Sequence, residues 1–155
     1  MRALTLRPWW AHAIAHMGKR CENRSQPIPR ALIGQRIAIH ARATPHWPAL
    51  TWHVESMRWE RAVTDAGHEP GALEGMKVVT RHIVATAVLG GEWRDRVDET
   101  LFPAWAEAGM HWWALDDVRT LVTPVPVPRG QLGLWRLPPE VGALVRERER
   151  EATRG

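Results

Sequence analysis

The chain has 155 residues, of which 45% are hydrophobic and 25% charged, as in a globular domain that buries its core without cross-links. Its single cysteine, Cys21, excludes an internal disulfide and a zinc site built on cysteine pairs. Lys and Arg outnumber Asp and Glu by 21 to 17. The net charge of +4 would suit a polyanionic partner such as a nucleic acid, but an excess of Arg and Trp is also what a GC-rich coding sequence produces.

The N-terminal region contains no continuous apolar run, because His12, His16 and Lys19 interrupt it. This pattern predicts neither a signal peptide nor a membrane-spanning helix. We therefore expect a cytoplasmic protein that has no membrane partner.

The first half of the sequence alternates predicted strands and helices. Apolar and β-branched runs predict short strands over residues 3–6 and 36–41. A helix is predicted between them, over residues 8–17, because a proline suits its first turn and Gly18 suits its end. Apolar residues at helical spacing predict a second helix over residues 51–66.

The middle of the sequence predicts further strands. The β-branched run over residues 78–89 indicates one long strand or two short ones, closed by a pair of glycines. Residues 93–109 are polar and mixed, which predicts a loop with a helical turn. A strand is expected over residues 111–115, and Asp116 and Asp117 are expected to turn the chain at its end.

The C-terminal part begins with a stretch in which proline alternates with valine, over residues 123–128. Such a stretch permits only an edge strand or an extended cover. A last strand is predicted over residues 130–137 and a helix over residues 139–150, where alternating Arg and Glu predict a solvated face or a frayed tail. Short strands with two or three helices indicate one domain of the α+β class.

The segment 17–24 concentrates residue types that are rare in this chain. Only two of the 21 basic residues are lysines, and Lys19 is one of them. Lysine and arginine differ in geometry and hydration, so a lysine here favours a role that arginine cannot fill. In an extended segment Glu22 and Arg24 share one face, and Lys19 meets Glu22 only if the turn after Gly18 reorients it.

Four pieces of the sequence carry a resemblance to a known family. Gly18-Lys19, followed by Glu22-Asn23-Arg24, resembles the Gly-Lys-x-x-Glu-Asn-Arg signature of the ASCH family, a branch of the PUA-like superfamily. The other pieces resemble the family's opening strand with its Pro-Trp-Ala helix start, the next strand and the closing part; they are residues 4–11, 37–41 and 112–117 with 128–135.

The resemblance implies a PUA-like small β-barrel flanked by two to three helices. It places this domain in residues 1–138, with an insertion around residues 45–75 that has no counterpart in the family and leaves a charged helix or tail over residues 139–155. It also implies binding of RNA or of a modified nucleobase in a cleft, with DNA left open as a partner.

The expected base-binding residues come from the signature and its surroundings. They are Lys19, Glu22, Arg24, Trp9, Ser25 and His40. Glu22 is expected to accept a hydrogen bond from an exocyclic amine or ring N–H, and the two cations to donate to a carbonyl or phosphate. Trp9 is expected to stack on a base at the rim of the cleft. The competing interpretation is that an ion pair between these charges only pins the helix to the barrel.

The alternative function is a hydrolase, with Lys19 and Glu22 as catalytic acid–base groups. The resemblance allows an N4-acetylcytidine amidohydrolase-like activity or a ribonuclease-like activity on RNA. The amidohydrolase members carry Thr as their nucleophile candidate at the position of Glu22, so this chain departs from their pattern. A third alternative is an interaction protein that uses residues 45–75 as its contact surface.

The sequence predicts no metal and no cofactor. His12 and His16 have the i, i+4 spacing that can bind zinc, but the sequence places no third ligand. Cys21 has no His or Asn fixed beside it that would make it a nucleophile. Trp10 follows a helical apolar stripe with Ile14 and is expected in the core. The sequence leaves the oligomeric state open.

Overall fold

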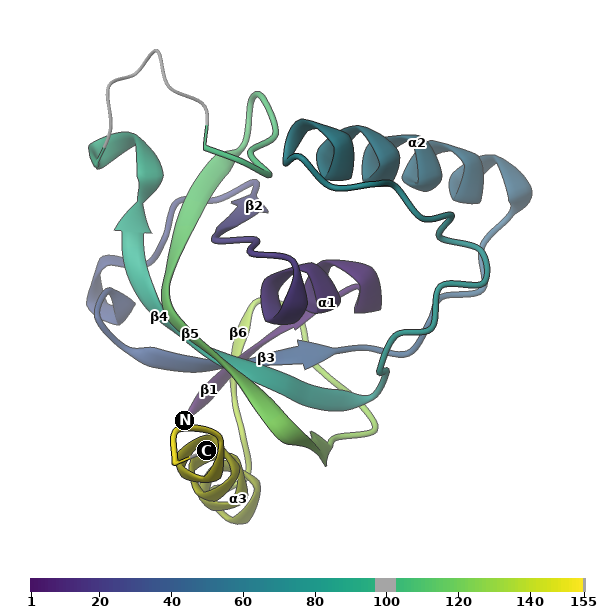
Figure 1. Ribbon diagram of the computed structural model, residues 1–155. Coiled ribbons are helices and arrows are strands. Elements are labelled where there is room, and N and C mark those ends of the chain that lie inside the picture. The colour runs from purple at the N-terminus through teal and green to yellow at the C-terminus, as the bar shows by residue number, and fades with distance from the viewer. Residues whose placement is uncertain (97–102, 155) are drawn as a thin grey trace.

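The computed structural model describes residues 1–96 and 103–154, in which six strands form one sheet flanked by three α-helices (Figure 1). The strands are β1 (Arg2–Leu6), β2 (Cys21–Arg24), β3 (Arg36–Ala41), β4 (His82–Glu92), β5 (His111–Pro126) and β6 (Leu134–Arg136). The helices are α1 (Pro8–His16), α2 (Ala49–Asp65) and α3 (Pro139–Ala152), with short 3₁₀ turns at η1 (Arg30–Leu32) and η2 (Trp93–Asp95). These elements confirm the α+β class.

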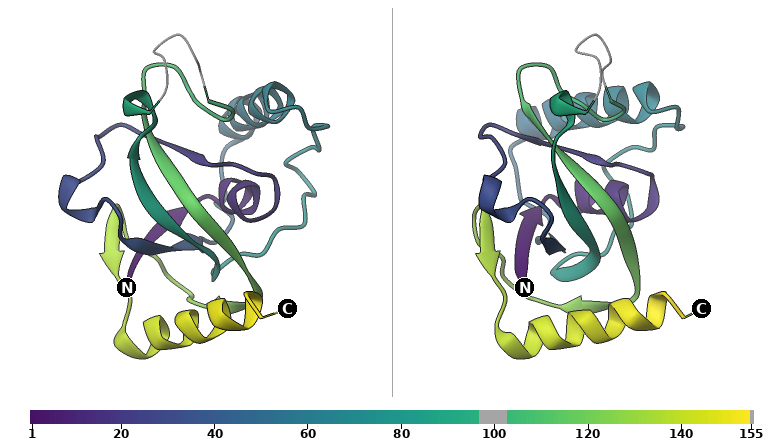
Figure 2. Two further views of the ribbon diagram at one scale, coloured as in Figure 1. Left: turned by 60° about the vertical axis from the view of Figure 1, so that its left-hand side comes forward. Right: turned by 90° about the vertical axis from the view of Figure 1, so that its left-hand side faces the viewer.

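The sheet has the order β2-β5-β4-β3-β1-β6. β1 and β3 run parallel, with Leu6 beside Ala41, and the other neighbours run antiparallel. The long strands β4 and β5 twist and bend, so the sheet curls into a half-barrel whose edges are β2 and β6 (Figures 1 and 2). Shifts of register between β4 and β5 contribute to this curvature.

The prediction of a turn at Asp116 and Asp117 is wrong. β5 continues through both residues to Pro126, and the pairing with β4 shifts its register at this point. Asp117 has a φ of 41°, as expected for a residue that bulges out of a strand. The bulge lets the strand bend without ending, and the Asp117 carboxylate pairs with Arg36 and Arg119.

Two other strand predictions have different outcomes. The pair of glycines at residues 90–91 does not close β4, because the strand runs on to Glu92. The prolines of residues 123–128 do lie at an edge: β2 covers β5 only over residues 111–114, and no other strand of the described chain pairs with the opposite side of Pro124 or Pro126. Of the loop expected over residues 93–109, residues 97–102 lie outside the described chain.

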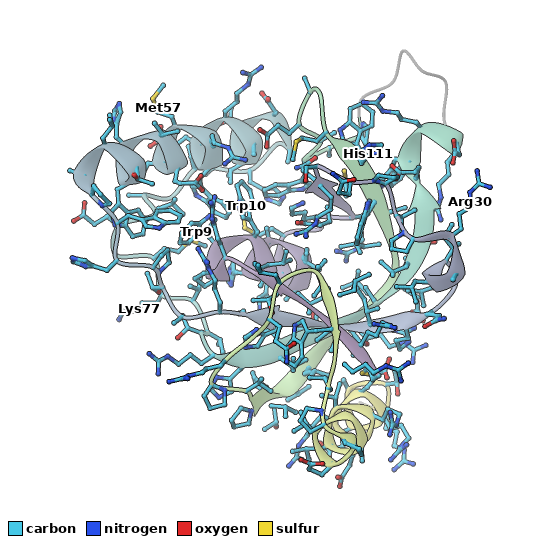
Figure 3. All side chains as sticks on the ribbon, turned by 180° about the vertical axis from the view of Figure 1, so that it is seen from behind. Trp9, Trp10, Arg30, Met57, Lys77 and His111 are labelled. Atoms are coloured by element: carbon cyan, nitrogen blue, oxygen red, sulfur yellow. The ribbon has the colours of Figure 1, made fainter. Side chains whose placement is uncertain are left out.

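The core consists of three clusters of buried apolar side chains, and α1 contributes to two of them. α1 packs into the curl of the sheet against β3, β4 and β5, where Ile14 is fully buried. α2 packs on α1 rather than on the sheet, and the cluster between them contains Trp9, Trp59 and Val63 (Figure 3). The opposite face of α2 carries exposed Met57, which points away from the molecule in Figure 3.

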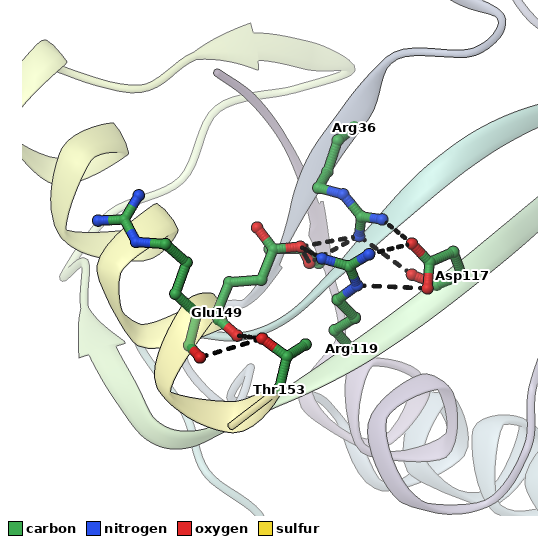
Figure 4. A network of polar contacts seen from close by, with 7 residues as sticks. Arg36, Asp117, Arg119, Glu149 and Thr153 are labelled. Atoms are coloured by element: carbon green, nitrogen blue, oxygen red, sulfur yellow. Dashed lines mark hydrogen bonds and ion pairs between the residues drawn. The ribbon is translucent and has the colours of Figure 1, made fainter. Parts of the chain in front are cut away.

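α3 is not a frayed tail, and only its outer face is solvated. Its inner face buries Val145 against the sheet and also buries the carboxylate of Glu149. Glu149 accepts a hydrogen bond from the Thr86 hydroxyl at 2.8 Å and forms ion pairs with Arg36 at 3.0 Å and Arg119 at 3.3 Å (Figure 4). The Arg–Glu alternation therefore conceals one buried position that docks the helix.

Among the described residues, none of the helices combines the length and the apolar character that crossing a membrane requires.

Candidate functional site

A cleft of about 340 Å³ opens where the two edges of the curled sheet approach each other. Its lining comes from the end of β1, from α1, from the segment between Lys19 and Arg24, from the residue after β3 and from residues 131–133 before β6. Arg58 of α2 and Glu107 contribute to its outer wall. The cleft is large enough to hold a group the size of a nucleobase.

Lys19 and Glu22 meet inside this cleft. Gly18 has a φ of 71°, which ends α1 and turns the chain, and the Lys19 amide then bonds the Ala13 carbonyl at 3.1 Å. The turn brings Lys19 Nζ to 3.3 Å from Glu22 Oε2, and Nζ also donates to the Cys21 carbonyl. Lys19 is 1% exposed and Glu22 7% exposed. The turn after Gly18 thus reorients Lys19 towards Glu22, which is the condition on which their meeting depended.

Arg24 lines the same cleft from the end of β2. Its guanidinium carbon lies 5.6 Å from the centre of the Trp113 ring, a cation–π distance. Within the described chain it has no carboxylate at ion-pair distance. Lys19, Glu22 and Arg24 are thus gathered in one concave site, and the Arg24 guanidinium has no carboxylate partner among the described residues.

Three expected binding residues lie elsewhere. Trp9 is 3% exposed, because Trp47, at 5.8 Å between centroids, and Trp52 of α2, at 5.6 Å, cover its ring. Ser25 is exposed beyond the end of β2 and lines a separate neighbouring hollow. His40 is fully buried between β1 and the segment after β5. In the structure none of these three side chains lines the cleft.

His40 instead supports a residue of the cleft, Thr5. His40 Nε2 donates to the Val127 carbonyl at 2.8 Å, so Nδ1 is free to accept from the Thr5 hydroxyl at 3.1 Å. Burial lowers the pKa of His40 and outweighs the opposing effect of the Val127 hydrogen bond. Trp135 Nε1 donates to the same hydroxyl at 2.9 Å. Gly130 packs so closely that a Cβ there would overlap both Thr5 and His40.

Trp10 takes the aromatic position that was expected of Trp9. It is half-buried, lines the cleft and lies between α1 and α2 (Figure 3). The Lys19 ammonium is 5.9 Å from the centre of its ring. The apolar stripe predicted Trp10 in the core, and its ring does pack against Trp59 with the centroids 5.4 Å apart, but another part of the side chain is open to the cleft.

Sequence reasoning missed the arginines of the outer wall. Arg7 follows β1 and Arg42 follows β3, and both line the cleft. Arg58 comes from α2, inside the segment without a family counterpart, and bonds Glu55 and Glu107 at 2.7 Å each. The parallel pairing of β1 and β3 brings Arg7 and Arg42 together, because residues that follow two parallel neighbours leave the sheet at the same edge, and the sequence did not predict that pairing.

Other candidate groups take no part in the site. Burial raises the pKa of the Cys21 thiol to about 12, so it is not a nucleophile at neutral pH. His12 and His16 stack with their ring centroids 4.7 Å apart. In the part of the chain that the structure describes, His, Cys, Asp and Glu side chains form no group of three that could hold a metal ion.

No protein-family model matches the chain, and a search of curated proteins finds no relative.

Proposed function

We propose that this chain is a PUA-like, ASCH-type protein that binds RNA or a modified nucleobase, with the base held in the cleft of Lys19, Glu22 and Arg24. One observation carries the proposal: a buried Lys19–Glu22 pair, 3.3 Å apart, lies in a cleft of about 340 Å³. A buried ion pair is weak support for stability by itself, so its position in a cleft favours recognition of a ligand.

The chemistry of the cleft suits the edge of a base. The Glu22 carboxylate offers acceptors for an exocyclic amine or a ring N–H, and the Lys19 ammonium offers a donor for a ring carbonyl. The indole of Trp10 provides a flat face for stacking, worth about 1–3 kcal/mol per base. A site built on such polar groups rejects analogues that leave them unpaired.

The fold supports the PUA-like part of the proposal. The signature segment forms the exit of α1 and the edge strand β2, and it faces the end of β1 across the cleft. The sheet is mixed and curled, with α1 packed inside the curl. This arrangement agrees with what the resemblance implies for residues 1–138.

Binding to purified protein tests the proposal. We expect single-stranded RNA and a subset of natural and modified nucleosides to bind, with the affinity of RNA falling as salt rises. Glu22→Gln is expected to change the order of preference among bases by about tenfold, since it alters one base contact worth about 1–3 kcal/mol. Arg24→Gln is expected to weaken all RNA ligands. Arg61→Gln, on the exposed side of α2 with 85% of its side chain accessible, is the control.

Two results would contradict base recognition. The first is a complete lack of binding by RNA, nucleosides and nucleotides at low salt. The second is equal binding of every base by the wild type and by Glu22→Gln, because a site that reads a base edge through a carboxylate must respond to its replacement by an amide.

A second function, hydrolysis of an N-acylated pyrimidine, is favoured by the Thr5–His40 hydrogen bond. Thr5 lines the cleft and donates its hydroxyl proton to neutral His40. Attack of Thr5 Oγ1 on the acyl carbon would form an ester, with the hydroxyl proton passing to His40 and the leaving amine taking a proton from Lys19 as the C–N bond breaks. Water would then hydrolyse the ester: Lys19 would take a proton from the attacking water, and the departing Thr5 oxygen would regain its proton from His40.

Product analysis separates this function from binding alone. N4-acetylcytidine, other acylated nucleosides and single-stranded RNA are incubated with wild type, Lys19→Ala and Thr5→Val. If the protein is a hydrolase, we expect the wild type to form a deacylated product, and both variants to form none while they remain folded. Product no higher than that of Lys19→Ala would remove the enzymatic alternative and leave the binding proposal unaffected.

A further inference from the structure

Two arginines lie side by side at the cleft, each directly after a strand of the sheet. Arg7 follows β1 and Arg42 follows β3, and the register pairs Leu6 with Ala41 in the residues just before them. The Arg42 amide bonds the Leu6 carbonyl at 3.0 Å, which continues the parallel pairing by one step. The two side chains therefore start from adjacent positions on the same edge, and both line the cleft.

Trp47 holds the two guanidinium groups close to each other. The guanidinium carbon of Arg7 lies 4.6 Å from the centre of the Trp47 ring, and that of Arg42 lies 6.0 Å from the same ring. An indole face stabilises a cation by cation–π attraction, which offsets part of the repulsion between the two charges. The Trp47 ring itself packs edge-on against buried Trp9, which anchors it to α1.

The carboxylates nearby do not balance these arginines. Glu55 is buried and forms an ion pair with Arg7 at 2.5 Å through Oε2, while its Oε1 lies 2.7 Å from Arg58. Arg58 also pairs with Glu107 at 2.7 Å. Arg42 has no carboxylate at ion-pair distance in residues 1–96 and 103–154. The three guanidinium groups thus share two carboxylates, which leaves one positive charge in excess.

Arg42 also has an unsatisfied donor. Its Nε is buried and has no hydrogen-bond partner in the part of the chain that the structure describes. A buried donor without a partner costs about 1–3 kcal/mol, more when it is charged. Burial and then the charge of Arg7 lower the pKa of Arg42, against a smaller opposing effect of Glu55. A negative group bound beside the Arg42 guanidinium would relieve the repulsion from Arg7 and offset the cost of burying the Arg42 charge.

We propose that Arg42 and Arg7 form a phosphate site in the cleft, so that the ligand is a phosphorylated nucleotide rather than a neutral nucleoside. This inference rests on the proposed function, since it assigns the base to Lys19 and Glu22 and the phosphate to the opposite wall. Guanidinium groups donate two parallel hydrogen bonds to phosphate oxygens, which neither the ammonium of Lys19 nor the amide of Gln131 can do. The same chemistry serves a mononucleotide and the backbone of single-stranded RNA.

Calorimetric titration tests the phosphate site directly. The probes are the four common nucleosides, their 5′-monophosphates, and a dinucleotide whose phosphate is a diester, all at 50 mM salt. We expect a 5′-monophosphate to bind at least tenfold more tightly than its nucleoside. Arg42→Gln is expected to remove that difference while leaving nucleoside affinity within twofold, and Arg61→Gln is expected to keep it. A dinucleotide that binds as tightly as the monophosphate assigns the site to an RNA backbone, and a weaker one to a terminal phosphate.

Inorganic phosphate and pyrophosphate separate failure of this inference from failure of base recognition. If no base binds but pyrophosphate raises the melting temperature of the wild type and not of Arg42→Gln, the phosphate site stands and the proposed function is wrong. If nucleoside and monophosphate bind the wild type equally, or if neither bases nor pyrophosphate bind, the phosphate site is wrong. Arg42→Lys keeps the positive charge and is expected to retain part of the monophosphate preference. Its melting temperature, compared with that of Arg42→Gln, shows whether a loss of preference is caused only by unfolding.

Discussion

Lys19 Nζ lies 3.3 Å from Glu22 Oε2, and both side chains are almost completely removed from solvent. The pair joins the exit of α1 to the edge strand β2 and at the same time forms part of the cleft wall. Its structural role and its proposed role in binding make different demands, because a structural pair needs only mutual compensation of charge. A pair that binds a base needs the carboxylate of Glu22 and the ammonium of Lys19 themselves, because each makes a different hydrogen bond to the ligand.

The first prediction concerns the stability of this pair. Lys19→Met leaves the Glu22 carboxylate buried without its counter-charge, and we expect it to lower the free energy of unfolding by about 3–5 kcal/mol. The double variant Lys19→Met/Glu22→Leu is expected to recover much of that loss, because no charge is then left unpaired. Urea denaturation of the wild type, of the single variants Lys19→Met and Glu22→Leu, and of the double variant gives the coupling energy.

The exposed pair Arg61–Asp65 provides the comparison, with 85% and 67% of its side chains accessible. Arg61→Met is expected to change the free energy of unfolding by no more than about 0.5 kcal/mol. If Lys19→Met were equally mild, the Lys19–Glu22 pair would not be shielded from water as the structure describes.

The second prediction concerns Gly130. A Cβ at this position would approach His40 Nδ1 to 2.6 Å and Thr5 more closely still, and both are held by their own hydrogen bonds. Gly130→Ala is expected to destabilise the protein by about 1–3 kcal/mol, the usual cost of overpacking. Gly71→Ala is the matched control, because nothing lies within 4 Å of its Cβ. Equal stability of the two variants would contradict the close packing at Gly130.

The third prediction concerns pH. Burial lowers the pKa of His40 in the folded protein below that of an unfolded chain, which is about 6.5. Below that pH the unfolded state binds more protons than the folded state. The stability contributed by neutral His40 is therefore complete above about pH 6.5 and is lost as the pH falls towards the folded pKa. Free energies of unfolding between pH 8 and pH 5 measure this slope.

His40→Gln is expected to flatten the dependence on pH between about 6.5 and 5, even though it lowers stability throughout. The pKa of His12 is also lowered, by burial and then by the charge of His16, so the wild type has more than one histidine contribution. His12→Gln is the control that removes only the second contribution. A slope unchanged by His40→Gln would show that His40 accepts a proton in the folded state as readily as in the unfolded one.

The fourth prediction concerns the docking of α3. Glu149 is buried and accepts from Thr86 while pairing with Arg36 (Figure 4). Glu149→Ala is expected to cost about 1.5–3 kcal/mol, the value of a hydrogen bond to a charged group. Glu151→Ala, on the solvated face, is expected to leave the denaturation midpoint unchanged. Equal effects of the two substitutions would restore the interpretation of this helix as a loosely held tail.

The sequence predicted local elements well where local residues decide them. The strand over residues 36–41 matches β3, and the helix over residues 8–17 matches α1 to within one residue. The turn expected at Asp116 and Asp117 failed because two acidic residues suit a bulge as well as a turn. Pairing with β4 over a long stretch decides between them, and that pairing is not visible in the local sequence.

The site was predicted in its centre and missed at its edges. The rare residues between Gly18 and Arg24 identified Lys19, Glu22 and Arg24, which the turn at Gly18 does bring together. Trp9 was chosen in place of Trp10, because adjacent residues on a helix differ by about 100° in direction and only α2 decides which of them is covered.

The sequence by itself determined the α+β class, the helix stop at Gly18 and the concentration of charge in one short segment, since these depend on backbone preference and composition. Only the tertiary structure decided that Arg7 and Arg42 stand together beside Trp47, that His40 faces Thr5 and not a ligand, and that Glu149 is buried. Each of these depends on contacts between residues at least 35 positions apart in the chain. The curl of the sheet and the packing of α2 and α3 make those contacts, and burial then changes what each charge or ring can do.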